Sequence, residues 1–520
     1  MGKTMTVFQS GSINTTALFV PDVYVQIQAP SENFLNGLPT NRLGVVGTAQ
    51  WGAVNAPTIV GSVSDYVQKF GNIQARKHDM GTAVWAAVLN GANDMRCVRV
   101  TDGTDIAASA TIGTTGLTVA GIYTGSLGNS LQVTLSAGSQ VNSWKAVVVM
   151  PGLVPEVYDN IGGGATPLTA NALWIAIASA INNGVSGLRG KSQLVVVTAG
   201  VSTADPVAGT TLLSGGTDGA TGVTGVTLLG SDVSPRKGMY ALRNTGVSVA
   251  FLTDCDDSTT WTAQVAFGLS EGVYIVAVTP VGDTIALATA AKAAAGIDSY
   301  AMKLLFGDWV YFNDTVNGQV RLISPQGFVA GRLSALSPEQ SSLNKPLYGI
   351  VGTQKSYQNL TYSNAELSVL AQAGIDLIAN PIPAGNSFGV RIGVNTSSNA
   401  VINGDNYTRM TNYIAYTLNA GMGLYVGQLQ SPKVRINALG TINAFLSNMW
   451  AQQMIGDVNS PQNQPFSIVL DASNNPANRV ALGYMQIDCR ITYFSVITKL
   501  LINVEGGQSV KVTSQNITGQ

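Results

Sequence analysis

The segment VAFLTDCDDSTTWTAQVAFGLSEGVYIVAV, residues 249–278, decides the fold class of the chain. It places two short apolar runs, 249–252 and 274–278, on either side of a helix-like run at 260–269. Short apolar runs bounded by turn residues are typical of buried strands, and strands that alternate with helices are typical of sheets with parallel pairs. The segment therefore predicts a mixed α/β core.

The same alternation continues on both sides of this segment. Upstream lies a predicted β-β-α-α-β block, whose elements we expect at 43–50, 58–60, 64–70 (a helix capped by Ser64), 81–89 and 95–100. Downstream we expect helices at 283–295, 407–418 and 439–450, and strands at 303–312 and within 481–496. The α/β pattern thus covers the chain from about residue 31, with one interruption.

The interruption runs from residue 104 to 245, where Thr, Ser, Gly and Val dominate and strand-like runs are frequent. We predict here an inserted, mostly β module on the outer surface of the protein. The predicted organisation is an N-terminal arm (1–30), the first part of the core (31–103), the inserted module (104–245), the α/β core (246–400), a C-terminal core domain (401–498) and a C-terminal arm (499–520).

Charged residues are sparse along the whole chain. The 520 residues include 27 Lys and Arg and 28 Asp and Glu, so that 11% are charged and the net charge is −1, while 45% are hydrophobic. An average soluble protein has about 25% charged residues. This balance excludes intrinsic disorder and a global basic field for nucleic acid or acidic membranes. Two interpretations stay open: a monomer with an uncharged polar coat, or a surface covered largely by copies of itself.

Other sequence features narrow the class further. The longest apolar runs, 173–181 and 285–297, are too short to span a bilayer, and the first eleven residues lack the apolar stretch of a signal peptide. Cys97, Cys255 and Cys489 are odd in number and far apart. This pattern favours free, buried thiols in a reducing compartment.

Candidates for catalysis or ligand binding are few. The single histidine, His78, lies between Lys77 and Asp79, and we predict it to be a solvated loop residue. A metal site requires clustered His, Cys or carboxylate ligands, and the sequence shows no such spacing. We therefore predict no metal and no cofactor.

Two near-matches to catalytic motifs fail on their context. Gly268–Gly272 fits G-x-S-x-G with Ser270 at its centre, but a predicted helix precedes it and a strand follows, the reverse of the required order. The glycines of Gly184…Gly190-Lys191-Ser192 are separated by five residues, whereas a phosphate loop has four. We predict that the chain is not an enzyme and functions by binding or assembly.

Several stretches in order resemble the tail sheath proteins of contractile-tailed bacteriophages. They are VPDVYVQ (20–26), the block from 44 to 71 ending in Phe-Gly, AVLNGANDMRCVRV (87–100), GSLGNSLQV (125–133), PEVYDNI (155–161), LSGGTDG (213–219), SPQGFVAG (324–331) and LAQAGIDLI (370–378). Asp22, Gln326 and Asp376 replace the glycine, serine and asparagine that the family has at these positions. The region from 430 follows the family only loosely, without its tryptophan-rich signatures.

The resemblance implies a structural subunit that forms six-fold rings stacked around a tail tube. Contraction of this polymer drives the tube through the host envelope for genome ejection, so the implied location is the virion tail, assembled in the host cytoplasm. The implied partners are further copies of the chain, the tail tube protein, and baseplate and tail terminator proteins, without direct nucleic-acid contact or membrane insertion. The alternatives are the sheath of a bacterial contractile injection or secretion system, another virion shell protein and, remotely, a serine hydrolase at Ser270.

The resemblance also implies terminal arms that add strands to neighbouring sheets. Alternating apolar residues at both ends of the chain agree with this, because free edges of that kind are usually blunted by Lys or Pro. The predicted arm positions are Val23, Tyr24, Val25, Ile27, Leu500, Ile502, Val504 and Val510. By analogy with sheaths, we expect the helix at 439–450 and the basic residues before it to face the tube, through Lys433, Arg435, Asn443 and Ser447.

Overall fold

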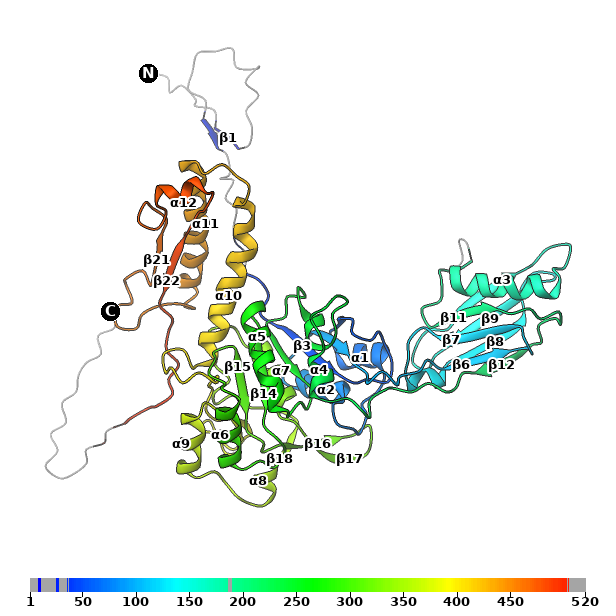
Figure 1. Ribbon diagram of the computed structural model, residues 1–520, viewed down its shortest axis with the longest axis horizontal. Helices are drawn as coiled ribbons and strands as arrows, with labels where there is room; N and C mark the ends of the chain where they lie inside the picture. Colours follow the sequence, from blue (N-terminus) through cyan, green and yellow to red (C-terminus); the bar gives the residue numbers. More distant parts are fainter. Residues whose placement is uncertain are drawn as a thin grey trace, which may run out of the picture. The chain divides into compact units, whose positions relative to one another are not determined.

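The computed structural model describes residues 8–10, 25–27, 35, 37–185, 189–502 and 504. The chain divides into two compact units. The C-terminal unit comprises Met1–Leu38 and Ile414–Phe494, and the core unit comprises Pro39–Tyr413 and Ser495–Gln520. Figure 1 shows the course of the chain.

The core unit contains a six-stranded sheet with the order β15-β14-β13-β3-β5-β4. Its strands are β3 (Arg42–Gly47), β4 (Thr58–Val60), β5 (Asp94–Arg99), β13 (Val249–Leu252), β14 (Tyr274–Val278) and β15 (Met302–Leu305). All neighbours pair in parallel except β4, which is antiparallel to β5. The predicted α/β class is therefore confirmed, and the strand order reverses between β3 and β13.

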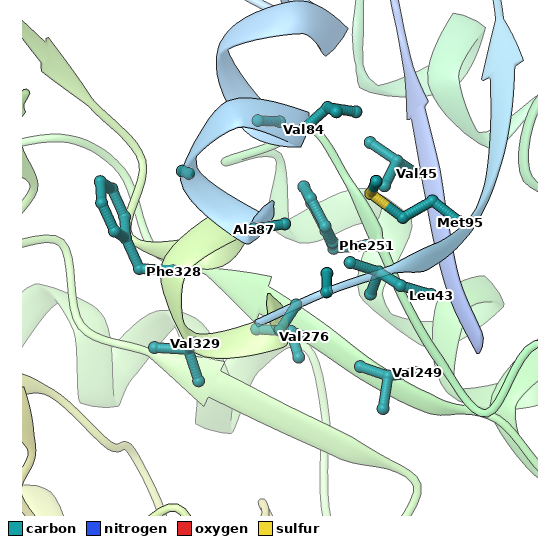
Figure 2. Close-up of a cluster of buried hydrophobic side chains, with 14 of the residues drawn as sticks. Leu43, Val45, Val84, Ala87, Met95, Val249, Phe251, Val276, Phe328 and Val329 are labelled. Atoms are coloured by element: carbon teal, nitrogen blue, oxygen red, sulfur yellow. The ribbon is translucent and has the colours of Figure 1, made fainter. Parts of the chain in front are cut away.

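Successive side chains of each strand point to opposite faces of the sheet. Apolar strand residues therefore lie on both faces, and helices cover both. On one face, shown in Figure 2, Val45, Phe251 and Val276 pack against helices α2 (Met80–Leu89) and α7 (Gln326–Ala335). On the other face, strand residues pack against a second set of elements. These are α4 (Gly225–Leu229), η3 (Gly238–Leu242), α5 (Trp261–Glu271), α6 (Ile285–Ala294) and α9 (Asn364–Gln372).

Two local predictions about the core are wrong. Helix α1 (Val63–Phe70) is capped by Ser62, whose side chain accepts from the Asp65 amide, and not by Ser64. The strand predicted at 303–312 is two strands, because β15 ends before Gly307, where an added Cβ would lie 1.9 Å from the carbonyl oxygen of Pro280. The chain turns at this close approach, and β16 (Val310–Asp314) then joins a three-stranded antiparallel sheet. Its order is β17-β16-β18, with β17 at Gln319–Ile323 and β18 at Ile350–Thr353.

Residues 108–213 enclose a hydrophobic core of their own, to which Trp51 also contributes. Two antiparallel sheets and helix α3 (Ala170–Asn183) surround it (Figure 1). The strands are β6 (Ser109–Ile112), β7 (Leu117–Gly121), β8 (Gln132–Ala137), β9 (Trp144–Val149), β10 (Glu156–Ile161), β11 (Val195–Ala199) and β12 (Gly209–Leu212). The predicted module extends to residue 245, whereas Val223, Leu228 and Leu242 pack on the central sheet.

The C-terminal unit combines long helices with a two-stranded antiparallel sheet of β21 (Phe466–Val469) and β22 (Asp488–Ile491). Helix α10 (Asp405–Met422) begins in the core unit and ends in this one. Helix α11 (Pro432–Ala451) starts at the Ser431 cap with Pro at its first position, a placement that suits proline. Both helices extend the predicted ones, but the prediction of strands within 481–496 is wrong except at β22, because α12 (Ala477–Ala481) and a loop occupy the first part.

The remaining elements are short. They are β1 (Phe8–Ser10), β2 (Val25–Ile27), η2 (Ser126–Ser130), η4 (Ser258–Thr260), β17 (Gln319–Ile323), β18 (Ile350–Thr353), α8 (Gln354–Tyr357), β19 (Ile378–Ala379), β20 (Gly389–Val390) and η5 (Gly423–Tyr425).

Candidate functional site

The reversal of strand order between β3 and β13 marks the place where open α/β sheets commonly bind ligands. Asp254 follows β13 at this edge, and its carboxylate accepts from the backbone amides of His78 (3.1 Å) and Ser324 (3.2 Å). His78 Nδ1 lies 2.8 Å from the carbonyl oxygen of Thr253. The prediction of a solvated His78 is wrong: it is 7% exposed, because these two contacts hold it against the sheet edge. Burial lowers the pKa of its imidazole.

A second buried carboxylate at this edge caps a helix. Asp79 Oδ2 accepts from the amides of Thr82 (2.8 Å) and Gln74 (3.1 Å), which closes the first turn of α2. Burial raises the pKa of Asp79 to about 6 and raises that of Asp254 as well. The cavity that remains beside Asp254 has a volume of about 10 Å³. That is room for about one water molecule, so the chain itself fills the position where a ligand would bind.

A buried ion network joins the central sheet to the start of α10. Lys303 Nζ lies 2.5 Å from Asp376 Oδ2 and 3.0 Å from Asp405 Oδ1, and all three side chains are fully buried. The Tyr274 hydroxyl donates to Asp405 Oδ1 at 2.6 Å, and the Ser342 hydroxyl donates to Asp405 Oδ2. Burial acts to lower the pKa of Lys303, but Asp376 and Asp405 outweigh it and raise that pKa.

The pattern of donors around this network indicates a structural role. Asp376 also accepts from four backbone amides, those of Leu377, Ile392, Gly393 and Val394. Charged groups that are paired and saturated in this way have no free lone pairs for chemistry. Within the described ranges, no group of three His, Cys, Asp or Glu residues is arranged to hold a metal ion.

The two motif near-matches serve local structure. The Ser270 hydroxyl donates to the carbonyl oxygen of Phe267 at 3.1 Å, in the last turn of α5, and Gly272 then ends that helix in the left-handed conformation. The Ser192 hydroxyl donates to the carboxylate of Glu156 at 2.6 Å. As predicted, Ser270 lies on a helix-to-strand turn and not at the strand-to-helix turn of a catalytic serine.

The predicted arm residues divide into three groups. Val25 and Ile27 lie in β2, which pairs in parallel with β1 through the registers Phe8↔Val25 and Ser10↔Ile27. Val23, Tyr24 and Val510 fall outside the described residues. Leu500, Ile502 and Val504 belong to no strand and are 79%, 70% and 85% exposed.

The C-terminal unit carries an open apolar groove of about 560 Å³. It is lined by fifteen residues, none of them charged, from α10, η5, α11, β22 and the two loops at 426–430 and 483–487. Gln430 ties the loops together by donating to the carbonyl oxygen of Tyr484 at 2.7 Å. Beside the groove, Val426, Leu429 and Leu482 are 85%, 88% and 76% exposed. Such a patch is typical of an interaction surface.

The residues expected to face a tube all lie on α11. Lys433 and Asn443 are exposed, whereas Arg435 and Ser447 are half-buried, and Arg435 donates to Gln430 Oε1 at 2.8 Å. The opposite face of the helix buries Ile442, Phe445, Leu446 and Met449, the apolar positions that its spacing predicts. The contact of the exposed face with a tube stays a prediction.

Comparison with solved structures shows the fold to be that of contractile sheath proteins. A sheath tail protein from Desulfitobacterium hafniense matches with a TM-score of 0.57 and 16% identity, covering 87% of this chain and 94% of its own. One from Listeria innocua matches with a TM-score of 0.60 and 14% identity, covering 84% and 90%. The contracted sheath of an extracellular contractile injection system matches with a TM-score of 0.53 and 11% identity, covering 95% and 99%.

Sequence identity to these structures is low, at 11–16%. Neither a protein-family model nor a curated protein sequence matches the chain. Over the described part of the chain, the helices are too short or too polar for any of them to cross a membrane.

Proposed function

We propose that the protein, which has the fold of contractile sheath subunits, is itself the subunit of a contractile tail sheath. The observation that carries this proposal is the near-complete coverage of both partners in each comparison, up to 95% of this chain and 99% of a contracted injection sheath. A shared core embedded in unrelated domains would not give such coverage. The filled ligand position at the edge of the central sheet favours a structural role over an enzymatic one.

Further copies of the chain are the principal partner in this proposal. The two-stranded sheet of β21 and β22 pairs with no third strand among the described residues, so each strand presents an open edge. An extended apolar segment that adds to such an edge satisfies its amides and carbonyls. Each hydrogen bond contributes a net ~0.5–1.5 kcal/mol, so several bonds per arm and two arms per subunit hold a polymer together through rearrangement.

The exposed segment around Leu500, Ile502 and Val504 fits this role. Three apolar side chains that are at least 70% exposed are costly in a free subunit. The uncharged groove of the C-terminal unit matches them in chemistry, and we propose that the C-terminal arm of a second copy covers it. The N-terminal arm, with Val23, Tyr24, Val25 and Ile27, adds a second link of the same kind.

The finer features of the proposal follow the family resemblance. The subunits form six-fold rings stacked around a tail tube, with Lys433, Arg435, Asn443 and Ser447 turned toward that tube and the inserted module turned outward. Baseplate and terminator proteins close the two ends. Contraction drives the tube through the host envelope for genome ejection, and the sheath belongs to a virion tail that is assembled in the host cytoplasm.

Negative-stain microscopy of the purified protein tests the proposal. We expect open tubes with a central channel wide enough for an inner tube. Closed shells would identify another virion shell protein, and a strictly monomeric protein at high concentration would reject assembly altogether. A fluorophosphonate probe that labels Ser270 would revive the hydrolase alternative.

A second candidate, the sheath of a contractile injection system, is favoured by the same coverage of 99% of such a sheath. The two differ in what the tube delivers. Particles recovered from the source with the sheath attached to a DNA-filled head identify a phage tail, and headless particles without DNA identify an injection system.

A further inference from the structure

Both ends of the C-terminal unit are fixed by a large apolar side chain that lies directly on a glycine. An added Cβ at Gly421 would lie 1.6 Å from Leu35 Cδ2, and one at Gly456 would lie 2.1 Å from Phe494 Cζ. Carbon atoms in contact are ~3.5–4.0 Å apart. Leu35 and Phe494 therefore occupy the space that any other residue at 421 or 456 would need for its own side chain.

The first contact holds the chain that follows the N-terminal arm. Gly421 lies one turn after Thr417 on α10, and residues four apart share one face of a helix. The amide of Leu38 donates to Thr417 Oγ1 at 3.3 Å, while Leu35 lies on Gly421. The described residues from 35 to 38 thus follow this face of α10 in the direction opposite to the helix.

The second contact holds the chain that precedes the C-terminal arm. The amide of Gly456 donates to the carbonyl oxygen of Thr492 at 3.1 Å, and Ile455 forms an isolated bridge with Tyr493. Two residues after Phe494, Val496 is still half-buried, and from Ile497, which is 79% exposed, the described chain is exposed. The last fixed point of the C-terminal unit is therefore the Phe494 ring on Gly456.

We propose that Gly421 and Gly456 are sockets that fix the two points at which the terminal arms leave the subunit. The proposal rests on the proposed function, since it takes the arms as links between copies. Because each arm starts at a fixed point, the number of residues free to reach a neighbouring copy is constant. In the proposed sheath, that number sets the spacing between linked subunits. Tension on an arm is therefore carried first by the contact at Gly421 or Gly456, and only then by the rest of the C-terminal unit.

Hydrogen exchange of the purified subunit tests the N-terminal socket without any assembly. In Gly421→Ala, the new methyl group displaces Leu35, and we expect the amide of Leu38 to exchange roughly tenfold faster, as overpacking of a filled site loosens the local structure. The matched control is Gly423→Ala, two residues on, where an added Cβ meets nothing within 4 Å. No change is expected there.

A double-mutant cycle separates a socket from a general weakening of α10. Leu35→Ala removes the same contact from the other side. The exchange rate of the Leu38 amide in the double variant Gly421→Ala/Leu35→Ala should therefore be close to the rates in the two single variants. If the two changes multiply, Leu35 and Gly421 act independently and the socket is refuted.

Microscopy of assembled tubes then tests the role of both sockets. Gly421→Ala and Gly456→Ala should give shorter tubes with irregular axial spacing, and so should Phe494→Ala, which adds no bulk. Gly440→Ala on α11 is the control for Gly456→Ala, because an added Cβ there also meets nothing within 4 Å. Regular tubes from all three variants would overturn the inference. If the wild-type protein forms no tubes while the exchange cycle shows coupling, the proposed function fails and the N-terminal socket stands.

Discussion

The six-stranded sheet of the core unit and the two-stranded sheet of the C-terminal unit differ in how far the subunit itself covers them. In the first, helices cover both faces, and Asp79, His78 and Asp254 fill the edge where the strand order reverses. In the second, neither strand pairs with a third strand among the residues that the structure describes, and an uncharged groove lies in the same unit. The central sheet is therefore enclosed by the subunit itself, whereas the C-terminal unit leaves an apolar groove exposed. The proposed assembly would cover that groove with a second copy.

The largest effect is expected from removing the charge of Lys303, which lies buried at the last strand of the central sheet. Lys303→Met leaves Asp376 and Asp405 buried without their cation, and breaking a buried ion pair costs ~3–5 kcal/mol. We expect that loss in the free energy of unfolding measured with urea. Adding Asp376→Asn and Asp405→Asn should restore part of it.

The control is Lys433→Met, an exposed lysine of the C-terminal unit, for which we expect a change within about 0.5 kcal/mol. Equal losses in the two variants would mean that the ion network contributes nothing beyond a general effect of losing a lysine.

The second prediction concerns the pH dependence of the closed edge. Burial raises the pKa of Asp79 from 3.8 to about 6, so the folded protein holds this proton more tightly than the unfolded chain does. The stabilising contribution is full below pH 3.8 and is lost as the pH rises through about 6. In Asp79→Asn, which keeps a side-chain oxygen for the helix cap, this loss is absent.

Urea unfolding of both proteins between pH 4 and 7 measures the effect. As the pH rises through this range, the unfolding free energy of the variant should increase by ~1–3 kcal/mol relative to that of the wild-type protein. Each unit of pKa difference corresponds to about 1.4 kcal/mol. His78 has a lowered pKa and the opposite slope, but it is present in both proteins and cancels in the difference. If the difference in unfolding free energy between the two proteins is the same at every pH, Asp79 is not the group whose titration changes stability.

Local sequence patterns predict the elements of the central sheet, but they do not predict contacts between residues that are distant in the chain. The alternation of apolar runs predicts β13, β14 and the helix between them almost to the residue. It cannot predict that Lys303 is buried, because its partners lie 73 and 102 residues away. His78 is misread for the same reason: its charged neighbours suggest a surface loop, whereas its own contacts come from Thr253 and Asp254.

The third prediction concerns the exposed segment around Val504, where a change should affect assembly more than stability. Proline at Val504 removes a backbone donor and fixes φ, which a paired strand does not tolerate. Val504 is 85% exposed and belongs to no strand of its own subunit, so the thermal unfolding midpoint should move by less than about 1 °C.

Tube length and integrity after contraction measure the other half of this prediction. We expect short tubes, or tubes that separate into pieces. If the variant subunit unfolds at a clearly lower temperature while its sheaths stay intact, the segment around Val504 is part of its own subunit's fold. It would then not be an arm that links subunits.

The smallest effect on the subunit is expected from charge reversal on α11. Lys433→Glu with Arg435→Glu removes one hydrogen bond, from Arg435 to Gln430, and otherwise changes half-buried or exposed positions. The unfolding free energy should change by ~1 kcal/mol or less. If this face contacts a tube, assembly on added tubes falls several-fold while tube-free polymer forms normally. Equal losses in both assays would reject the tube contact.

The way the chain enters and leaves the region of residues 108–213 has a practical consequence. Its two ends run side by side: the amide of Asp102 donates to the carbonyl oxygen of Gly219 at 2.7 Å, and Ile106 bridges Thr217. An insertion with adjacent ends can be exchanged without stretching its host. This site is therefore a suitable graft point for an enzyme, a fluorescent protein or an affinity domain with similarly close termini, and the proposed sheath would carry it in many copies.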